Sequence, residues 1–214
     1  AAAQQLAACA LPAVWLQTRR ADAETDAETG TVGATLGLTR LGGLPDLPQG
    51  MPWPTRPAYP DADQRGRYPR AVERPFQGRL QTKFPLNFLA QINFAQLHAV
   101  AQLGEDWPST GLLSIFYDLT EQPWGSSPAD GVGLQLHYTE DASAPLQRCA
   151  QPQALQQLPA HWQMAALECR LHGCVTPLPL ASTAWKALSR TLDDEVSQRY
   201  EDWYSDTVEL GTDG

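Results

Sequence analysis

Three runs of the sequence have the composition of β-strands: LNFLAQINF at 86–94, LLSIFYDL at 112–119 and VGLQLHY at 132–138. Each is rich in branched and aromatic residues, and a fourth run at 166–175 alternates in the same manner. The segments between the runs have the pattern of loops, not of helices, which favours antiparallel pairing. The sequence therefore predicts an α+β fold that consists mainly of antiparallel sheet.

The run at 132–138 has one apolar and one polar side. Leu134, Leu136 and Tyr138 share one face, and Gln135 and His137 share the other. This alternation is typical of a sheet with one side packed, so we expect the three large apolar side chains to face the core.

Helices are expected at both ends of the chain. Residues 1–10 (AAAQQLAACA) favour a helix that ends near Pro12. An amphipathic helix is predicted over 182–209, with Ser182 or Thr183 as its N-cap. Its apolar positions recur at steps of three or four residues and are Trp185, Leu188, Leu192, Val196, Tyr200 and Trp203.

Connections take up much of the remaining chain. With 16 Gly and 18 Pro in 214 residues, the regular elements should be short and the loops numerous. Additional short strands are expected at 13–16 and 35–39, and the acidic run at 21–30 is expected to be a solvated loop. The length and the 43% of hydrophobic residues fit one domain over 1–214.

The net charge of −9 restricts the classes of partner. An excess of carboxylates repels phosphate backbones, so we expect no binding to nucleic acid. No apolar stretch reaches the about 20 residues of a membrane span, and no signal peptide is recognisable. We therefore expect no membrane association and a cytoplasmic location, and the four cysteines are expected to be reduced and mostly buried.

Charge is also segregated along the chain. Residues 56–83 carry seven basic and three acidic groups and have no hydrophobic period, which predicts a long arginine-rich excursion from the core. This excursion is expected to fold back onto the acidic C-terminal helix or to contact an acidic partner. The surfaces that could bind a partner are the acidic side of the helix, with Asp193, Asp194, Glu201 and Asp202, and the excursion, with Arg65, Arg67 and Arg70.

Catalytic and metal-binding patterns are weak. The sequence has no G-x-S-x-G elbow and no glycine-rich phosphate loop, and it predicts no cofactor. A metal-like group, Cys169-x2-His172-x-Cys174 with Cys149 and His161 elsewhere, lacks the paired spacing of zinc sites, and its Cys169 and His172 would point to opposite faces of a strand. Ordinary thiols are the preferred interpretation over zinc.

Four motifs in series resemble the YwqG-like family. They are RLGGLPDLP at 40–48 followed by Trp53-Pro54, then PLNFLAQIN at 85–93, GLLSIFYD at 111–118 and Pro123-Trp124-Gly125. The resemblance is best over 31–138 and looser in the helical end, and the 56–83 excursion is longer than the family pattern. It implies an α+β fold with antiparallel sheet and no catalytic residues, because the family is a domain of unknown function. Relatives that occur near secreted bacterial toxins suggest an immunity role.

We therefore expect a non-enzymatic protein-binding domain and, more narrowly, a bacterial immunity protein that neutralises a toxin by binding it. The alternative is an enzyme or small-molecule binder with a pocket beside the Gly42-Gly43 turn. That pocket would be lined by Trp53, Gln91 and Trp124. A concave site with converging polar groups would distinguish the alternative from a protein-binding surface.

Overall fold

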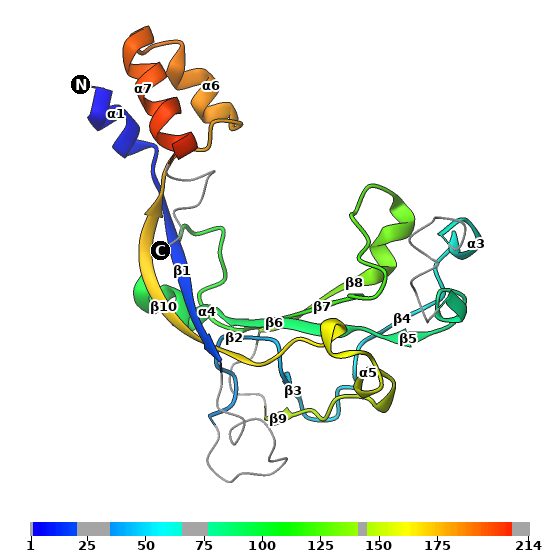
Figure 1. Cartoon of the computed structure of the whole chain (residues 1–214). Coiled ribbons are helices and arrows are strands. Elements are labelled where there is room, and N and C mark those ends of the chain that lie inside the picture. Colours follow the sequence, from blue (N-terminus) through cyan, green and yellow to red (C-terminus); the bar gives the residue numbers. More distant parts are fainter. Residues whose placement is uncertain (1, 21–34, 66–76, 141–144, 207–214) are drawn as a thin grey trace.

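The computed structural model describes residues 2–20, 35–65, 77–140 and 145–206 (Figure 1). Its main sheet has the strand order β1-β10-β2-β6-β7-β8, and every neighbouring pair is antiparallel. These strands are β1 Leu11–Arg20, β10 Leu167–Thr176, β2 Arg40–Leu41, β6 Asn87–Asn93, β7 Leu112–Tyr117 and β8 Leu134–Thr139. The predicted α+β fold with a mainly antiparallel sheet is confirmed.

Two small strand pairs and several short helices complete the described part of the chain. The pairs are β3 Asp46–Pro48 with β9 Leu146–Arg148, and β4 Thr55–Arg56 with β5 Phe84–Pro85. The α-helices are α1 Ala2–Ala8, α3 Ala62–Arg65, α4 Phe94–Val100, α5 Gln153–Gln156, α6 Thr183–Ser189 and α7 Asp194–Tyr204; the 3₁₀ turns are η2 Gln77–Arg79, η3 Pro128–Gly133 and η4 Ala160–Trp162.

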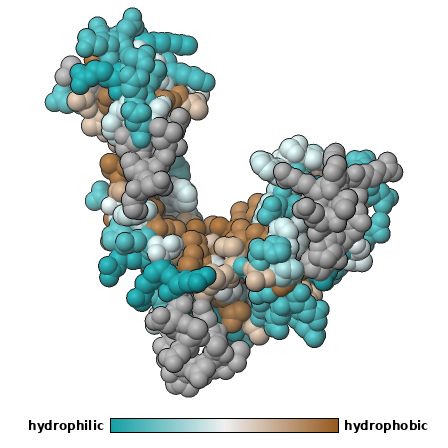
Figure 2. Space-filling model, viewed as in Figure 1, coloured by the Kyte–Doolittle hydropathy of each residue, from teal (hydrophilic) through white to brown (hydrophobic). Residues whose placement is uncertain are grey.

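β1 and β10 form a long ribbon that stands away from the remaining sheet. The two strands pair over ten residues, from Leu11 opposite Thr176 to Arg20 opposite Leu167. Figure 1 shows α1, α6 and α7 at the far end of this ribbon, while α3 and the loop before β8 rise at the opposite end of the molecule. The ribbon and this second arm enclose a hollow, and Figure 2 shows apolar surface at its floor.

One cluster of the hydrophobic core lies between β3 and the strands β6 and β7. Leu47, Leu86, Phe88 and Phe116 form its centre, and Trp53 packs edge-on against Phe116 with ring centroids 5.7 Å apart. Figure 1 places β3, β9 and α5 on this side of β6 and β7. The opposite side of β7 and β8 faces the hollow (Figure 1).

Three local predictions are wrong. Residues 35–39 form a turn with Gly37 at φ +74°, and the strand begins only at Arg40. The single helix predicted over 182–209 is two helices, because Asp193 has extended backbone and caps α7 through its side chain, which accepts a hydrogen bond from Glu195 N. The four cysteines are free, but Cys174 is exposed and the other three are only half-buried. The predicted loop at 21–30 lies outside the described residues.

Candidate functional site

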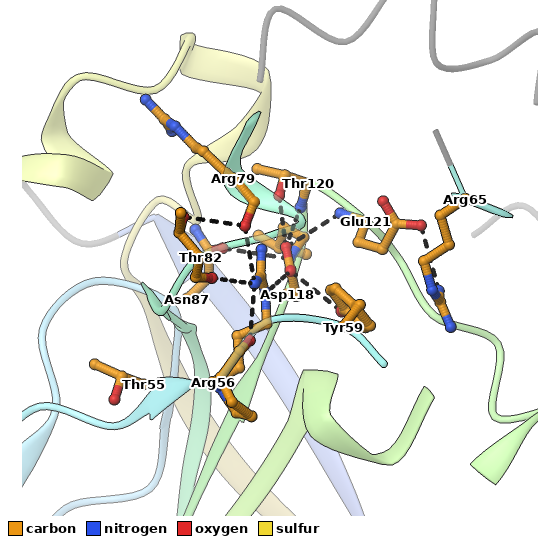
Figure 3. Close-up of polar contacts among 12 residues, drawn as sticks. Thr55, Arg56, Tyr59, Arg65, Arg79, Thr82, Asn87, Asp118, Thr120 and Glu121 are labelled. Atoms are coloured by element: carbon orange, nitrogen blue, oxygen red, sulfur yellow. Dashed lines mark hydrogen bonds and ion pairs between the residues drawn. The ribbon is translucent and has the colours of Figure 1, made fainter. Parts of the chain in front are cut away.

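A buried ion pair joins the start of the arginine-rich excursion to the end of β7 (Figure 3). Arg56 Nε donates to Asp118 Oδ2 at 2.5 Å, and the two side chains are only 1% and 2% exposed. Arg56 Nη1 also donates to the carbonyls of Pro57, Arg79 and Thr82. One guanidinium therefore fixes both ends of the described excursion, at 57 and at 79–82, against the sheet.

The Asp118 carboxylate is fully engaged by this arrangement. Its Oδ2 accepts from Arg56 Nε and from the Tyr59 hydroxyl, and its Oδ1 accepts from Thr120 N, Thr120 Oγ1 and Glu121 N. Burial, together with the neighbouring Asp118 charge, raises the pKa of Tyr59 above its ordinary value, so the phenol remains a neutral donor. No lone pair on Asp118 is left for acid-base chemistry on a substrate, so its contacts are those of a structural residue.

Arg65 forms a second junction within the same arm. It pairs with Asp61, one helical turn earlier, and with Glu121 and Asp130 from the connection between β7 and β8. Burial opposes its charge, but these hydrogen bonds hold the pKa of Arg65 above its ordinary value, and the bond from Arg65 holds that of Asp130 below its usual range. We call Arg56, Tyr59, Arg65 and Asp118 the arginine clamp.

β8 emerges from the arginine clamp with its apolar side toward water. Leu134, Leu136 and Tyr138 are all exposed, whereas Gln135 and His137 face the core side. The expectation that the three apolar residues pack inward is therefore wrong. The capping box between Ser127 and Asp130 fixes η3, which leads into β8. On the core side, Gln135 Nε2 donates to Thr55 O and the His137 ring packs edge-on against Phe116. These contacts turn the polar residues of β8 to the core and its apolar residues outward.

This apolar surface continues onto the neighbouring strand. Leu113, Ile115 and Tyr117 of β7 lie directly opposite Tyr138, Leu136 and Leu134, so the six side chains share one face. At one end the Phe94 ring is 5.9 Å from Tyr138 and 6.2 Å from the exposed Trp107. We call Leu113, Ile115, Tyr117, Leu134, Leu136 and Tyr138 the apolar face.

The structure places the residues predicted for a small-molecule pocket in different surroundings. A Cβ on Gly42 would lie 2.2 Å from Ala165 O, so this turn is filled by the chain that precedes β10. Gln91 is fully buried, with its amide bonded to Asp46 and to Leu38 O. Trp53 packs in the core, whereas Trp124 is 87% exposed. A Cβ on Gly43 would lie 2.7 Å from the Ala166 Cβ, so this glycine is also closely packed.

The predicted partner-binding residues separate into two groups. Asp193, Asp194, Glu201 and Asp202 lie on or beside α7 at the far end of the ribbon, with Asp193 engaged as N-cap and Asp202 accepting from Gln198. Arg65 is 11% exposed and belongs to the arginine clamp, where it pairs with Glu121 and Asp130 and not with the C-terminal helix; its role as a partner contact stays a prediction. Arg67 and Arg70 lie outside the described residues.

Comparison with known families places the chain in one of them. The sequence model of a family described as a domain of unknown function (DUF1963) matches residues 39–210. The chain belongs to the DUF1963 family. The match begins just before β2 and extends beyond α7, so the arginine clamp and the apolar face both lie within the DUF1963 region. No curated protein matches the chain.

Two structural tests bear on the classes of site. Among residues 2–20, 35–65, 77–140 and 145–206, no three His, Cys, Asp or Glu side chains are grouped as a metal ion would require. Within the same ranges, no helix is long and apolar enough to cross a membrane.

Sequence reasoning missed the arginine clamp and the outward phase of β8. Arg56 and Asp118 are 62 positions apart, and neither belongs to a motif that connects them. A local signal exists for Asp118, since Asp followed by Thr120 is typical of a side chain that bonds to its own turn. For β8, the available signal is that residues 84–147 contain no Lys or Arg, which distinguishes the composition of this region from that of the rest of the chain.

Proposed function

We propose that this DUF1963 chain is a non-enzymatic protein-binding domain whose apolar face contacts the partner. The observation that carries the proposal is the phase of β8, which turns Leu134, Leu136 and Tyr138 to solvent and its polar side chains to the core. Contiguous exposed apolar surface on a folded domain is typical of interaction sites. The aromatic side chains of Tyr138 and Trp107 are of the kind that contribute most to interface affinity.

The charge of the molecule supports a basic partner. The net charge of −9 accelerates encounters with a positively charged protein, and the acidic group on α7 adds to this field at the far end of the ribbon. In its narrower form, the proposal makes the chain a cytoplasmic, YwqG-like bacterial immunity protein that neutralises a basic toxin by covering it. The surface then gives the affinity, and the charge gives the rate of association.

The experiment is affinity capture from the native lysate with wild type and two matched variants. Leu136→Asn places an amide on the apolar face, and Leu11→Asn makes the same change at an exposed leucine near the ribbon tip; the two leucines are 58% and 62% exposed. We expect wild type and Leu11→Asn to retain one stoichiometric protein, identified by mass spectrometry, and Leu136→Asn to lose at least tenfold in affinity, about 1.4 kcal/mol.

Two results contradict the proposal at different levels. If wild type retains no stoichiometric protein, the chain is not a protein-binding domain. If Leu136→Asn retains the partner as well as Leu11→Asn does, the apolar face is not the contact surface. A third variant, with Asp193, Asp194, Glu201 and Asp202 changed to their amides, tests the acidic group: unchanged binding and association rate would exclude it from recognition.

A further inference from the structure

The outer edge of β8 is unpaired by any described strand, and it presents backbone hydrogen-bonding groups as well as apolar side chains. β8 is the last strand in the order β1-β10-β2-β6-β7-β8. Asp118 N donates to Gly133 O, which makes this pair a hydrogen-bonded one, and bonded and non-bonded pairs alternate along an antiparallel ladder. Gln135, His137 and Thr139 therefore direct their backbone groups toward β7, and Leu134, Leu136 and Tyr138 direct theirs outward.

Most of the outward groups have no partner within the described part of the chain. The Leu134 N–H donates to Gly131 O, which ends η3. The N–H groups of Leu136 and Tyr138, and the carbonyls of Leu134, Leu136 and Tyr138, have no hydrogen bond to another described residue. The same three residues thus combine an exposed apolar side chain with an outward backbone.

β8 itself lacks three features that commonly prevent strand addition. Edge strands of folded proteins are commonly protected by a charged residue, a proline or a β-bulge. The sequence of β8, LQLHYT, contains no charged residue and no proline, and its pairing with β7 has no register shift. An edge without these features presents a regular row of donors and acceptors, and another β-strand can pair with such a row.

We infer that β8 is the docking edge for an extended segment of the partner, which adds to the sheet as a seventh strand beside it. This inference rests on the proposed function and specifies its mode of binding. Alternate side chains of the added strand lie on the apolar face beside Leu134, Leu136 and Tyr138. The backbone bonds supply affinity, and the apolar positions supply specificity.

The charge around β8 specifies the composition of the added segment. Residues 84–147 contain no Lys or Arg and seven acids, of which Asp118, Glu121 and Asp130 are already paired with Arg56 or Arg65; the other four are Glu105, Asp106, Glu140 and Asp141. Exposed Glu105 and Asp106 precede Trp107, and exposed Glu140 directly follows the strand, so the Tyr138 end of the edge is acidic. The occupant is therefore an extended segment with apolar residues at every second position and Lys or Arg between them.

The test uses an eight-residue peptide of alternating Lys and Val, capped at both ends and labelled with a fluorophore. The corresponding Glu-Val peptide is the charge control. Leu136→Pro removes the outward N–H, which the sheet does not use, and Leu136→Ala removes a similar part of the side chain but keeps the N–H. Thermal unfolding of both variants controls for folding.

We expect the Lys-Val peptide to bind wild type in a saturable manner, and to bind at least tenfold more weakly to Leu136→Pro than to Leu136→Ala. The Glu-Val peptide should bind at least tenfold more weakly than the Lys-Val peptide. Amide hydrogen exchange on wild type, which needs no variant, should show Leu136 and Tyr138 becoming protected when the Lys-Val peptide is added. Equal binding by Leu136→Pro and Leu136→Ala, or no new protection at these two amides, would overturn strand addition.

The same variants separate this inference from the proposed function. If the captured partner is lost with Leu136→Asn but binds Leu136→Pro and Leu136→Ala equally, the apolar face binds a partner without strand addition, and only this inference is wrong. If wild type sediments as a dimer that Leu136→Pro converts to a monomer, the occupant is a second copy of this chain, and the partner-strand inference is again wrong.

Discussion

Replacing Asp118 by Asn tests the arginine clamp with the smallest change of shape. The substitution keeps the volume of the side chain but removes the charge that faces Arg56 Nε at 2.5 Å. Both groups are almost fully buried, so the Arg56 guanidinium would remain in the interior without a counter-charge. Breaking a buried ion pair by removing one partner costs about 3 to 5 kcal/mol in the free energy of unfolding.

This cost is large in comparison with the stability of a domain, which is about 5 to 15 kcal/mol. A chain of this length loses roughly 2 to 4 °C in melting temperature for each kcal/mol, so the variant should melt about 6 to 20 °C lower than wild type. Urea unfolding followed by tryptophan fluorescence measures the free energy directly, and the chain has seven tryptophans to report it.

Glu168→Gln is the matched control. It breaks the Arg19–Glu168 pair, whose side chains are 76% and 42% exposed, and exposed pairs contribute about 0 to 1 kcal/mol. The double variant Arg56→Met with Asp118→Leu removes both buried charges, so it should be more stable than Asp118→Asn. If Asp118→Asn cost no more than Glu168→Gln, the buried pair would not hold the excursion to the sheet, and the reasoning would be refuted.

Three further results are expected from other parts of the molecule. Gly42→Ala should destabilise the fold by more than about 2 kcal/mol, because its Cβ would meet Ala165 O at 2.2 Å. Gly50 also has positive φ but nothing within 4 Å of its Cβ position, so Gly50→Ala should cost only about 1 to 2 kcal/mol for the left-handed backbone. Urea titration compares the free energies of unfolding of the two variants. Burial lowers the pKa of His137 below 6.5, so the unfolded chain binds this proton more tightly and stability should fall as the pH drops from 6.5 through the lower pKa of the folded state. His137→Gln should remove this pH dependence. In the free protein the Leu136 amide should exchange with deuterium faster than the His137 amide, and equal rates would contradict the assigned pairing phase of β8.

The parts of the fold that could be predicted from sequence are those with a local cause. The strands at 86–94, 112–119 and 132–138 and the N-terminal helix each carry their own pattern, and β6, β7, β8 and α1 are found there within a few residues. The arginine clamp has no local cause, because Arg56 meets Asp118 only after β4, β5 and β7 have assembled. The basic run at 56–83 predicts a binding surface in an acidic chain, and the structure pairs two of its arginines, Arg56 and Arg65, with internal carboxylates.

The phase of β8 depends on contacts beyond the strand itself. An alternating strand has two faces, and its sequence alone does not state which one meets the core. Here η3 delivers the chain so that Gln135 bonds to Thr55 O and His137 lies on Phe116, and a shift by one residue would break both contacts. Because this phase leaves Leu136 in water, a polar residue there would cost the isolated fold little. The stability of the free chain therefore does not account for the large apolar residues on this edge, whereas the proposed partner strand would.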